Sequence, residues 1–136
     1  MKNTELRIGN FVFIPKTTQI VFISAIGMTG CYVNNNNIIG LIPFDEIETV
    51  SLTEEWILKF GFNCTNKIAK CFKKYHNEET ADFSGLFLKE IGNNPVWNYS
   101  ANNKWTFNSF LVEVQHVHQL QNLYFSITGS ELQLVV

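Results

Sequence analysis

The sequence predicts an α+β protein built mostly of β-strands, in which a small barrel is followed by an antiparallel sheet with two short helices. Three features of the sequence support this prediction. Short apolar runs separated by turn residues fill the first third of the chain, a short helix signal follows them, and further apolar runs lead to a second helix signal. With 136 residues, 46% of them apolar and 16% charged, the chain is too apolar and too poor in charge to be disordered.

The first predicted unit covers residues 1–51. Gly27 to Gly30 and the asparagines from Asn34 to Asn37 are credible turns, because Gly and Asn tolerate positive φ. A single helical turn is expected at residues 44–47, before the last strand. This order predicts a five-stranded barrel resembling the Src-homology-3 type, with strands at residues 8–14, 20–26, 31–33, 38–42 and 48–50.

The second predicted unit is an α+β lobe over residues 52–136, packed on the barrel. A helix over 53–60 is indicated by the possible cap Thr53, by acidic residues in its first turn, and by Gly61, where a left-handed cap is needed. Strands are expected at residues 68–75, 85–91, 96–99 and 105–114. A second helix over 118–128 and a terminal strand over 132–136 follow; the helix carries the apolar stripe Leu120, Leu123, Tyr124 and Ile127 and ends at Gly129.

The sequence also predicts the cellular location of the protein. The longest apolar run near the N-terminus ends at Pro15, far short of the ~20 residues that span a bilayer, and the first ten residues lack a signal-peptide pattern. We therefore expect a cytoplasmic protein of the host cell, with no membrane partner. Cys31, Cys64 and Cys71 are odd in number and lack metal-ligand spacing, so we expect structural thiols.

Four stretches carry a resemblance to a known family. They are residues 5–10 (ELRIGN), 52–56 (LTEEW), 59–62 (KFGF), and 117–125 (VHQLQNLYF) followed by Thr128 and Gly129. Together they resemble a family of small uncharacterised proteins encoded by phages and mobile elements of gut anaerobic bacteria. The resemblance implies a phage or mobile-element origin and transfers no catalytic residue.

One basic run could bind a phosphate-bearing, nucleotide-like small molecule. A net charge of -2 argues against a dedicated duplex-DNA binder, but local basic groups beside aromatic rings could hold a nucleotide. Because one chain has few basic groups, we expect such a site between copies in a homo-oligomer. The alternatives are an edge strand guarded by lysines and aromatic rings that belong to the core. The candidate ligand-binding residues are Arg7, Lys70, Lys73, Lys74, Trp97, Tyr99, Lys104 and Trp105.

A group of amides at the start of the second helix is the candidate partner-binding surface. It consists of His118, Gln119, Gln121 and Asn122. Amides on a helix surface can hydrogen-bond a partner protein, or alternatively the backbone of an adjacent sheet edge. His116 and His118 have a spacing that suits metal on a strand, but no further ligand pair accompanies them, so we expect neither a metal nor another cofactor.

The function expected from these features is that of a non-enzymatic binding protein. The sequence holds no nucleophile elbow, phosphate-binding loop or dinucleotide fingerprint. Together with the family resemblance, this favours interference with a host defence pathway, either by binding a host protein or by sequestering a nucleotide signal. A virion or replication accessory protein that contacts nucleic acid is the alternative, and a small hydrolase is the third possibility.

Overall fold

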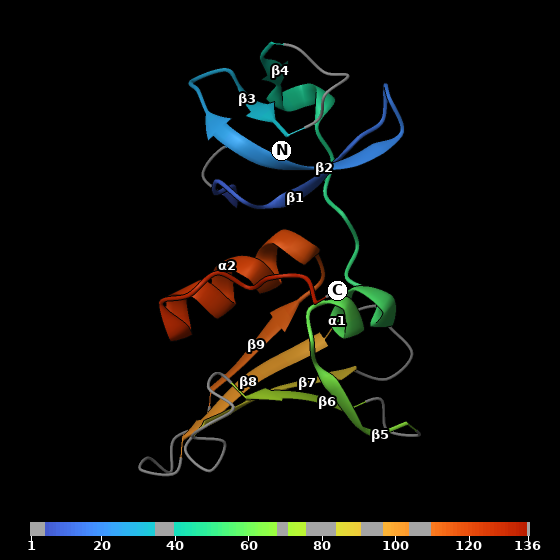
Figure 1. The fold of residues 1–136 in the computed structure, drawn as a ribbon, viewed down its shortest axis with the longest axis vertical. Helices are drawn as coiled ribbons and strands as arrows, with labels where there is room; N and C mark the ends of the chain where they lie inside the picture. Colours follow the sequence, from blue (N-terminus) through green and yellow to red (C-terminus); the bar gives the residue numbers. More distant parts are fainter. Residues whose placement is uncertain are drawn as a thin grey trace. The chain divides into compact units, whose positions relative to one another are not determined.

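The computed structural model describes residues 5–34, 40–67, 71–75, 84–90, 97–103 and 110–135 (Figure 1). The chain divides into two compact units. The first comprises Met1–Ser51 and His116–Asn122, and the second comprises Leu52–Gln115 and Leu123–Val136. Each unit therefore contains part of the C-terminal helix. Within the described residues, no helix is long and apolar enough to cross a membrane.

The first unit contains a four-stranded antiparallel sheet that curls into a half-barrel (Figure 1). Its strands are β1 (Phe11–Ile14), β2 (Gln19–Ile26), β3 (Gly30–Val33) and β4 (Ile42–Pro43), in that order across the sheet. A short 3₁₀ helix, η2 (Phe44–Glu46), follows β4. Alternate side chains of β1 and of the first half of β2 face the core, because successive side chains of a strand point to opposite faces of the sheet. The core cluster consists of Leu6, Val12, Ile14, Val21, Ile23, Cys31, Val33 and Ile47.

The predicted five-stranded barrel of the Src-homology-3 type is not confirmed. The expected fifth strand forms only an isolated bridge, in which the backbones of Phe13 and Glu48 exchange two hydrogen bonds of 2.8 Å. The next residues leave β1 and pair with the start of the C-terminal helix: Val117 N donates to Val50 O, and Ser51 forms a bridge with His116. This second pairing limits the strand to a single residue.

The second unit contains the predicted antiparallel sheet, which has five strands in the order β5-β6-β7-β8-β9. The strands are β5 (Asn63–Asn66), β6 (Cys71–Tyr75), β7 (Ser84–Glu90), β8 (Trp97–Asn103) and β9 (Phe110–Val114). Strand β5 was not predicted, because its sequence Asn-Cys-Thr-Asn has no apolar alternation; pairing with β6 defines it. The mixed composition, mostly strands with two helices, is confirmed.

The predicted terminal strand is wrong. Residues 131–135 form no strand, although Leu132 is buried. Leu134 and Val135 are 41% and 59% exposed, and Val135 N donates to Lys59 O at 2.7 Å. Alternating apolar residues form a strand only where a neighbouring strand pairs with them, and none does so here among the described residues.

Both helices begin and end close to the predicted residues. Helix α1 (Glu54–Lys59) starts at Thr53, whose hydroxyl accepts a hydrogen bond from Trp56 N. Helix α2 (Val117–Thr128) is followed by Gly129 at φ +74°. The left-handed glycines confirm the expected caps, since Gly61 has φ +86°.

The buried face of α2 differs from the predicted stripe. Leu120 and Tyr124 are buried, but Leu123 is only half-buried, and the side chain of Ile127 lies outside the described residues. Val117, His118 and Gln121 complete the buried face. Two polar side chains therefore occupy positions where a helix normally carries apolar ones.

Gly61 is required both by its backbone and by its surroundings. A Cβ at this position would lie 2.8 Å from Lys74 Nζ and 2.8 Å from Val135 Cγ2. Gly129 shares the positive φ but has no atom within 4 Å of the corresponding position. A comparison of substitutions at the two glycines therefore distinguishes the cost of backbone strain from the cost of steric crowding.

We predict that Gly61→Ala destabilises the chain more than Gly129→Ala. Each variant places a Cβ at positive φ, which costs ~1 to 2 kcal/mol, and only Gly61→Ala must also displace Lys74 and Val135. Thermal unfolding of both variants measures the difference. Equal losses of melting temperature would show that the crowding at Gly61 is relieved without cost.

Candidate functional site

Gln121 on α2 pairs with the backbone of β1 as a neighbouring strand would. Its Oε1 accepts from Phe11 N at 2.9 Å, and its Nε2 donates to Gly9 O at 3.0 Å. One primary amide thus satisfies one backbone donor, Phe11 N, and one backbone acceptor, Gly9 O. Gln121 is only 2% exposed, so these bonds are shielded from water.

Asn10 connects this amide to a second one. It is 1% exposed; its Oδ1 accepts from Arg7 N at 2.7 Å, and its Nδ2 donates to Asn122 Oδ1 at 2.8 Å. A longer contact of 3.4 Å joins Asn10 Nδ2 to Gln121 Oε1. The side chain therefore closes the local turn from Arg7 and also binds α2.

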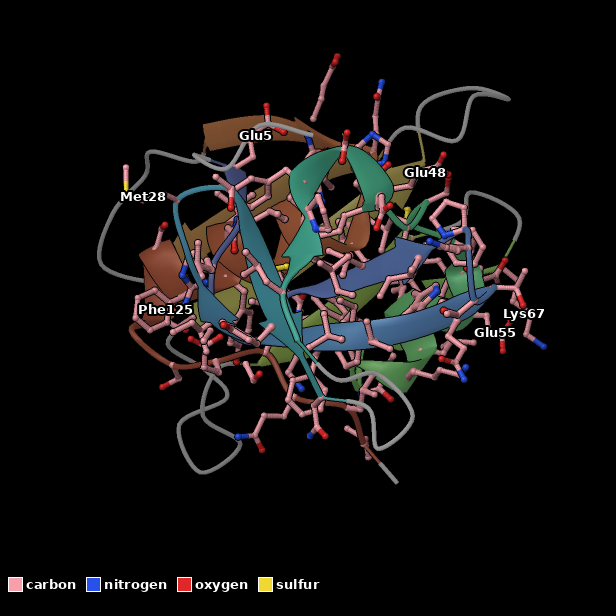
Figure 2. All side chains as sticks on the ribbon, turned by 90° about the horizontal axis from the view of Figure 1, so that it is seen from above. Glu5, Met28, Glu48, Glu55, Lys67 and Phe125 are labelled. Atoms are coloured by element: carbon pink, nitrogen blue, oxygen red, sulfur yellow. The ribbon has the colours of Figure 1, made fainter. Side chains whose placement is uncertain are left out.

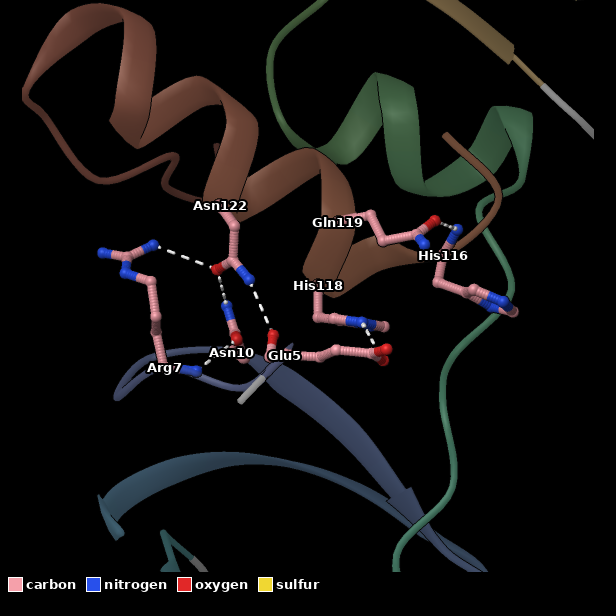
Figure 3. A network of polar contacts seen from close by, with 7 residues as sticks. All are labelled: Glu5, Arg7, Asn10, His116, His118, Gln119 and Asn122. Atoms are coloured by element: carbon pink, nitrogen blue, oxygen red, sulfur yellow. Dashed lines mark hydrogen bonds and ion pairs between the residues drawn. The ribbon is translucent and has the colours of Figure 1, made fainter. Parts of the chain in front are cut away.

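Asn122 joins α2 to the segment before β1 (Figure 3). Its Oδ1 also accepts from Arg7 Nη1 at 3.1 Å, and its Nδ2 donates to Glu5 O at 2.9 Å. We call Arg7, Asn10, Gln121 and Asn122 the amide network. It holds the first turns of α2 against residues 5–11.

The amide network and the Phe13–Glu48 bridge together satisfy the outer edge of β1. Unpaired edge strands invite pairing with other chains. Here Gly9 O, Phe11 N and the backbone of Phe13 bind partners outside the sheet, whereas Gly9 N donates to Ile23 O of β2. Gln121 therefore binds the backbone of an adjacent sheet edge, which was the alternative to binding a partner protein.

The two histidines lie beside this network with their rings stacked. The ring centroids of His116 and His118 are 5.8 Å apart, at 17° between planes. His118 is 1% exposed, and neither of its ring nitrogens has a hydrogen-bond partner among the described residues. Its Nε2 lies 4.0 Å from Glu5 Oε2, too far for a hydrogen bond. Burial, followed by repulsion from His116, lowers the pKa of His118, while Glu5 partly opposes that shift.

The four residues predicted to bind a partner are all engaged within the chain. Gln119 Oε1 accepts from His116 N at 3.1 Å at the start of the helix. His118 and Gln121 are buried, and Asn122 is half-buried. Of the four, Gln121 and Asn122 bind the N-terminal segment. The role of the four residues toward a partner protein stays a prediction.

The described members of the predicted nucleotide site are divided between the two units. Arg7 belongs to the first unit, whereas Lys73 and Lys74 are on β6 of the second. Lys74 Nζ donates to Phe60 O at 2.9 Å, next to the Gly61 cap. Strand β6 lies between β5 and β7, so the alternative of a guarded edge strand is wrong.

The remaining predicted ligand-binding residues are described only in part or not at all. Trp97 and Tyr99 are on β8, where Trp97 pairs with Val114, and Tyr99 with Leu88 and Val112. Lys70, Lys104 and Trp105 lie outside the described residues. The nucleotide site therefore stays a prediction.

The cysteines occur in three different environments. Cys31 is buried in the first core, which raises the pKa of its thiol; Cys64 is exposed, and Cys71 is half-buried. None of them forms a disulfide with another. Within the described ranges, no three His, Cys, Asp or Glu side chains are grouped to hold a metal ion.

The sequence analysis missed five exposed apolar side chains on and beside the curled sheet. We call this set the uncharged sheet surface; it consists of Ile20 and Ile26 on β2, Tyr32 on β3, Met28 in the turn between these strands and Leu41 just before β4, and their exposed fractions range from 38% to 94%. Figure 2 shows Met28 projecting from the ribbon. The signal was present in the sequence, because no charged residue occurs between Lys16 and Asp45.

Comparisons with protein-family models, with curated proteins and with solved structures find no match to this chain.

We predict that Gln121→Leu destabilises the chain by about 2 kcal/mol or more. The variant keeps the apolar stem but leaves Phe11 N and Gly9 O unpaired, at a cost of ~1 to 3 kcal/mol for each buried group. Denaturant unfolding measures the change. The same substitution at exposed Gln133 is the matched control. A similar stability of the two variants would contradict the edge-pairing role.

We predict that His118 makes the folded chain less stable below about pH 6.5. Because burial lowers its pKa in the folded state, the unfolded chain binds the proton more readily, and stability falls as the pH drops through the unfolded value. His118→Phe should flatten this dependence in unfolding measured from pH 8 to pH 5. His116→Phe, the control, should keep most of it. An unchanged slope in His118→Phe would overturn the prediction.

Proposed function

We propose that the chain is a non-enzymatic binding protein of phage or mobile-element origin that interferes with a host defence pathway by binding a host protein. The uncharged sheet surface is the observation that carries this proposal. Exposed apolar side chains are ordinary when they are scattered singly, but here five lie in one stretch of chain free of charge. The centres of protein interfaces are likewise depleted in charged residues.

A protein partner accounts for the described residues better than a nucleotide does. A multiply charged ligand needs several converging cations. Of the candidates described, Arg7 already donates to Asn122, and Lys74 donates to Phe60. By contrast, the apolar side chains of the uncharged sheet surface are open to solvent.

A non-enzymatic role is supported by the environments of two reactive groups, Cys31 and His118. The Cys31 thiol is buried and its pKa is raised, which disfavours the nucleophilic thiolate. His118 is shielded from solvent.

We further propose that the half-barrel, closed by the Phe13–Glu48 bridge, is a reduced barrel of the Src-homology-3 type.

Capture of host proteins by charged variants of the surface tests the proposal. The double variant Ile20→Lys with Tyr32→Lys adds charge to two side chains that are 49% and 47% exposed. Ile8→Lys is the matched control, because Ile8 is 59% exposed in the same unit but precedes the charge-free stretch. In lysate from a gut anaerobe, we expect one protein to be captured by wild type and by the control, and to be lost from the double variant.

Two further measurements complete this test. Thermal unfolding must show that the variants are folded, and the captured protein, once purified, should form a complex with wild type in size-exclusion chromatography. Calorimetric titration with linear and cyclic nucleotides should give no heat. Nucleotide binding, or capture that ignores the added charges, would contradict the proposed function.

A further inference from the structure

His118 lies on the buried face of α2, one turn before the amides that bind residues 5–11. Gln121 and Asn122 follow it by three and four residues, so the three side chains project from neighbouring positions of one helix face. His118 is 1% exposed, and no hydrogen bond reaches either of its ring nitrogens among the described residues. Gln121, by contrast, uses both ends of its amide in hydrogen bonds to the backbone. The contact therefore combines bonded amides with an unbonded imidazole.

A positive charge on His118 is unfavourable in this place for three reasons. Burial removes the water that would solvate the charge. The ring of His116, a second titratable group, lies 5.8 Å away between centroids. His118 is also the second residue of α2, and the N-terminus of a helix disfavours cations. The folded chain therefore keeps this ring neutral.

Glu5 is the group that opposes this preference (Figure 3). Its Oε2 lies 4.0 Å from His118 Nε2, but its side chain is 53% exposed, so water weakens the attraction. Arg7, on the same segment before β1, donates to Asn122 Oδ1. The ionisable groups that act on the ring are Glu5 and His116, and burial together with His116 outweighs the carboxylate, so the pKa of His118 is lowered.

The core of the first unit can stay packed when α2 separates from residues 5–11. The core cluster is drawn from residues 6–47, and the outer edge of β1 is also held at Phe13 by the backbone of Glu48. Separation breaks the hydrogen bonds that the two helix amides make to the N-terminal segment, and it brings the His118 ring into water. Such local openings, which leave a core intact, cost less free energy than global unfolding.

We propose that the contact between the first turns of α2 and residues 5–11 is an acid-sensitive latch. When His118 takes up a proton, the latch opens while the curled sheet stays folded. Because burial lowers the pKa of His118 in the closed state, the open state binds the proton more readily, and opening is favoured as the pH falls below about 6.5. The open latch frees Phe11 N and Gly9 O at the edge of β1. This device is independent of the uncharged sheet surface and of its proposed partner.

Hydrogen exchange of single backbone amides, measured by NMR in the full chain, tests the latch. The reporter is Phe11 N–H, which donates to Gln121 Oε1, and the control on the same edge of β1 is Phe13 N–H, which donates to Glu48 O. After correction for the intrinsic pH dependence of exchange, we expect the protection of Phe11 to fall about three- to tenfold between about pH 7.5 and about pH 5.5. Low concentrations of denaturant should leave the exchange of Phe11 unchanged, because local opening exposes little surface.

The comparison of the two amides separates local opening from global unfolding. Equal protection of Phe11 and Phe13, with the same dependence on denaturant, would mean that the edge of β1 is released only by global unfolding, and it would overturn the latch.

Two variants identify the titrating group. His118→Phe removes the proton site and should abolish the pH dependence of Phe11 protection. Glu5→Gln should extend that dependence to lower pH, because the carboxylate is the group that favours the protonated ring. It also keeps the backbone oxygen that binds Asn122, so the closed latch is retained. A dependence that persists in His118→Phe, or one that Glu5→Gln leaves unchanged or shifts to higher pH, would overturn the latch.

Discussion

The outer edge of strand β1 is the constraint on which the first unit depends. A sheet of four short strands leaves a row of backbone donors and acceptors on its first strand, and each buried unpaired group costs free energy. The chain satisfies this edge with one side-chain amide, Gln121, and one backbone bridge, Phe13 to Glu48. Because Gln121 lies on α2, the start of that helix is an integral part of the first unit.

This solution places polar side chains on the buried face of α2. Asn10 and Gln121 are nearly inaccessible to solvent, but their hydrogen bonds offset the cost of burial. His118 differs, since its ring nitrogens lack partners among the described residues and its pKa is lowered. Among the described residues, His118 should therefore make the stability depend on pH, while the amide side chains of the network do not titrate between pH 5 and pH 8.

The first unit thus buries its amides and exposes apolar side chains of its curled sheet. Two of the amides that the sequence offers as partner-binding groups, Gln121 and Asn122, bind residues 5–11 instead. The side chains open to solvent are those of the uncharged sheet surface, with Met28 the most exposed among them. This inversion is the physical basis for proposing an apolar contact with a protein in place of a polar one.

Features that depend on a few neighbouring residues were determined by the sequence itself. The Thr53 cap, the left-handed glycines at 61 and 129, and the apolar runs that became β1 and β2 are local, since each depends on one residue's conformation or on a few consecutive residues. Amides near position 121 were recognised as hydrogen-bonding groups, but the sequence could not distinguish a partner protein from the chain's own sheet edge.

Only the tertiary structure decided the features that depend on distant residues. The polar segment β5 is a strand because β6 pairs with it, whereas the apolar alternation at residues 132–136 meets no such neighbour in the part described. The same pairing places the lysine-bearing β6 inside its sheet. The partner of Gln121 is Phe11, 110 residues away, and no local period encodes that contact. Backbone pairing across such separations depends on which donors and acceptors folding brings together, and that is a property of the whole chain.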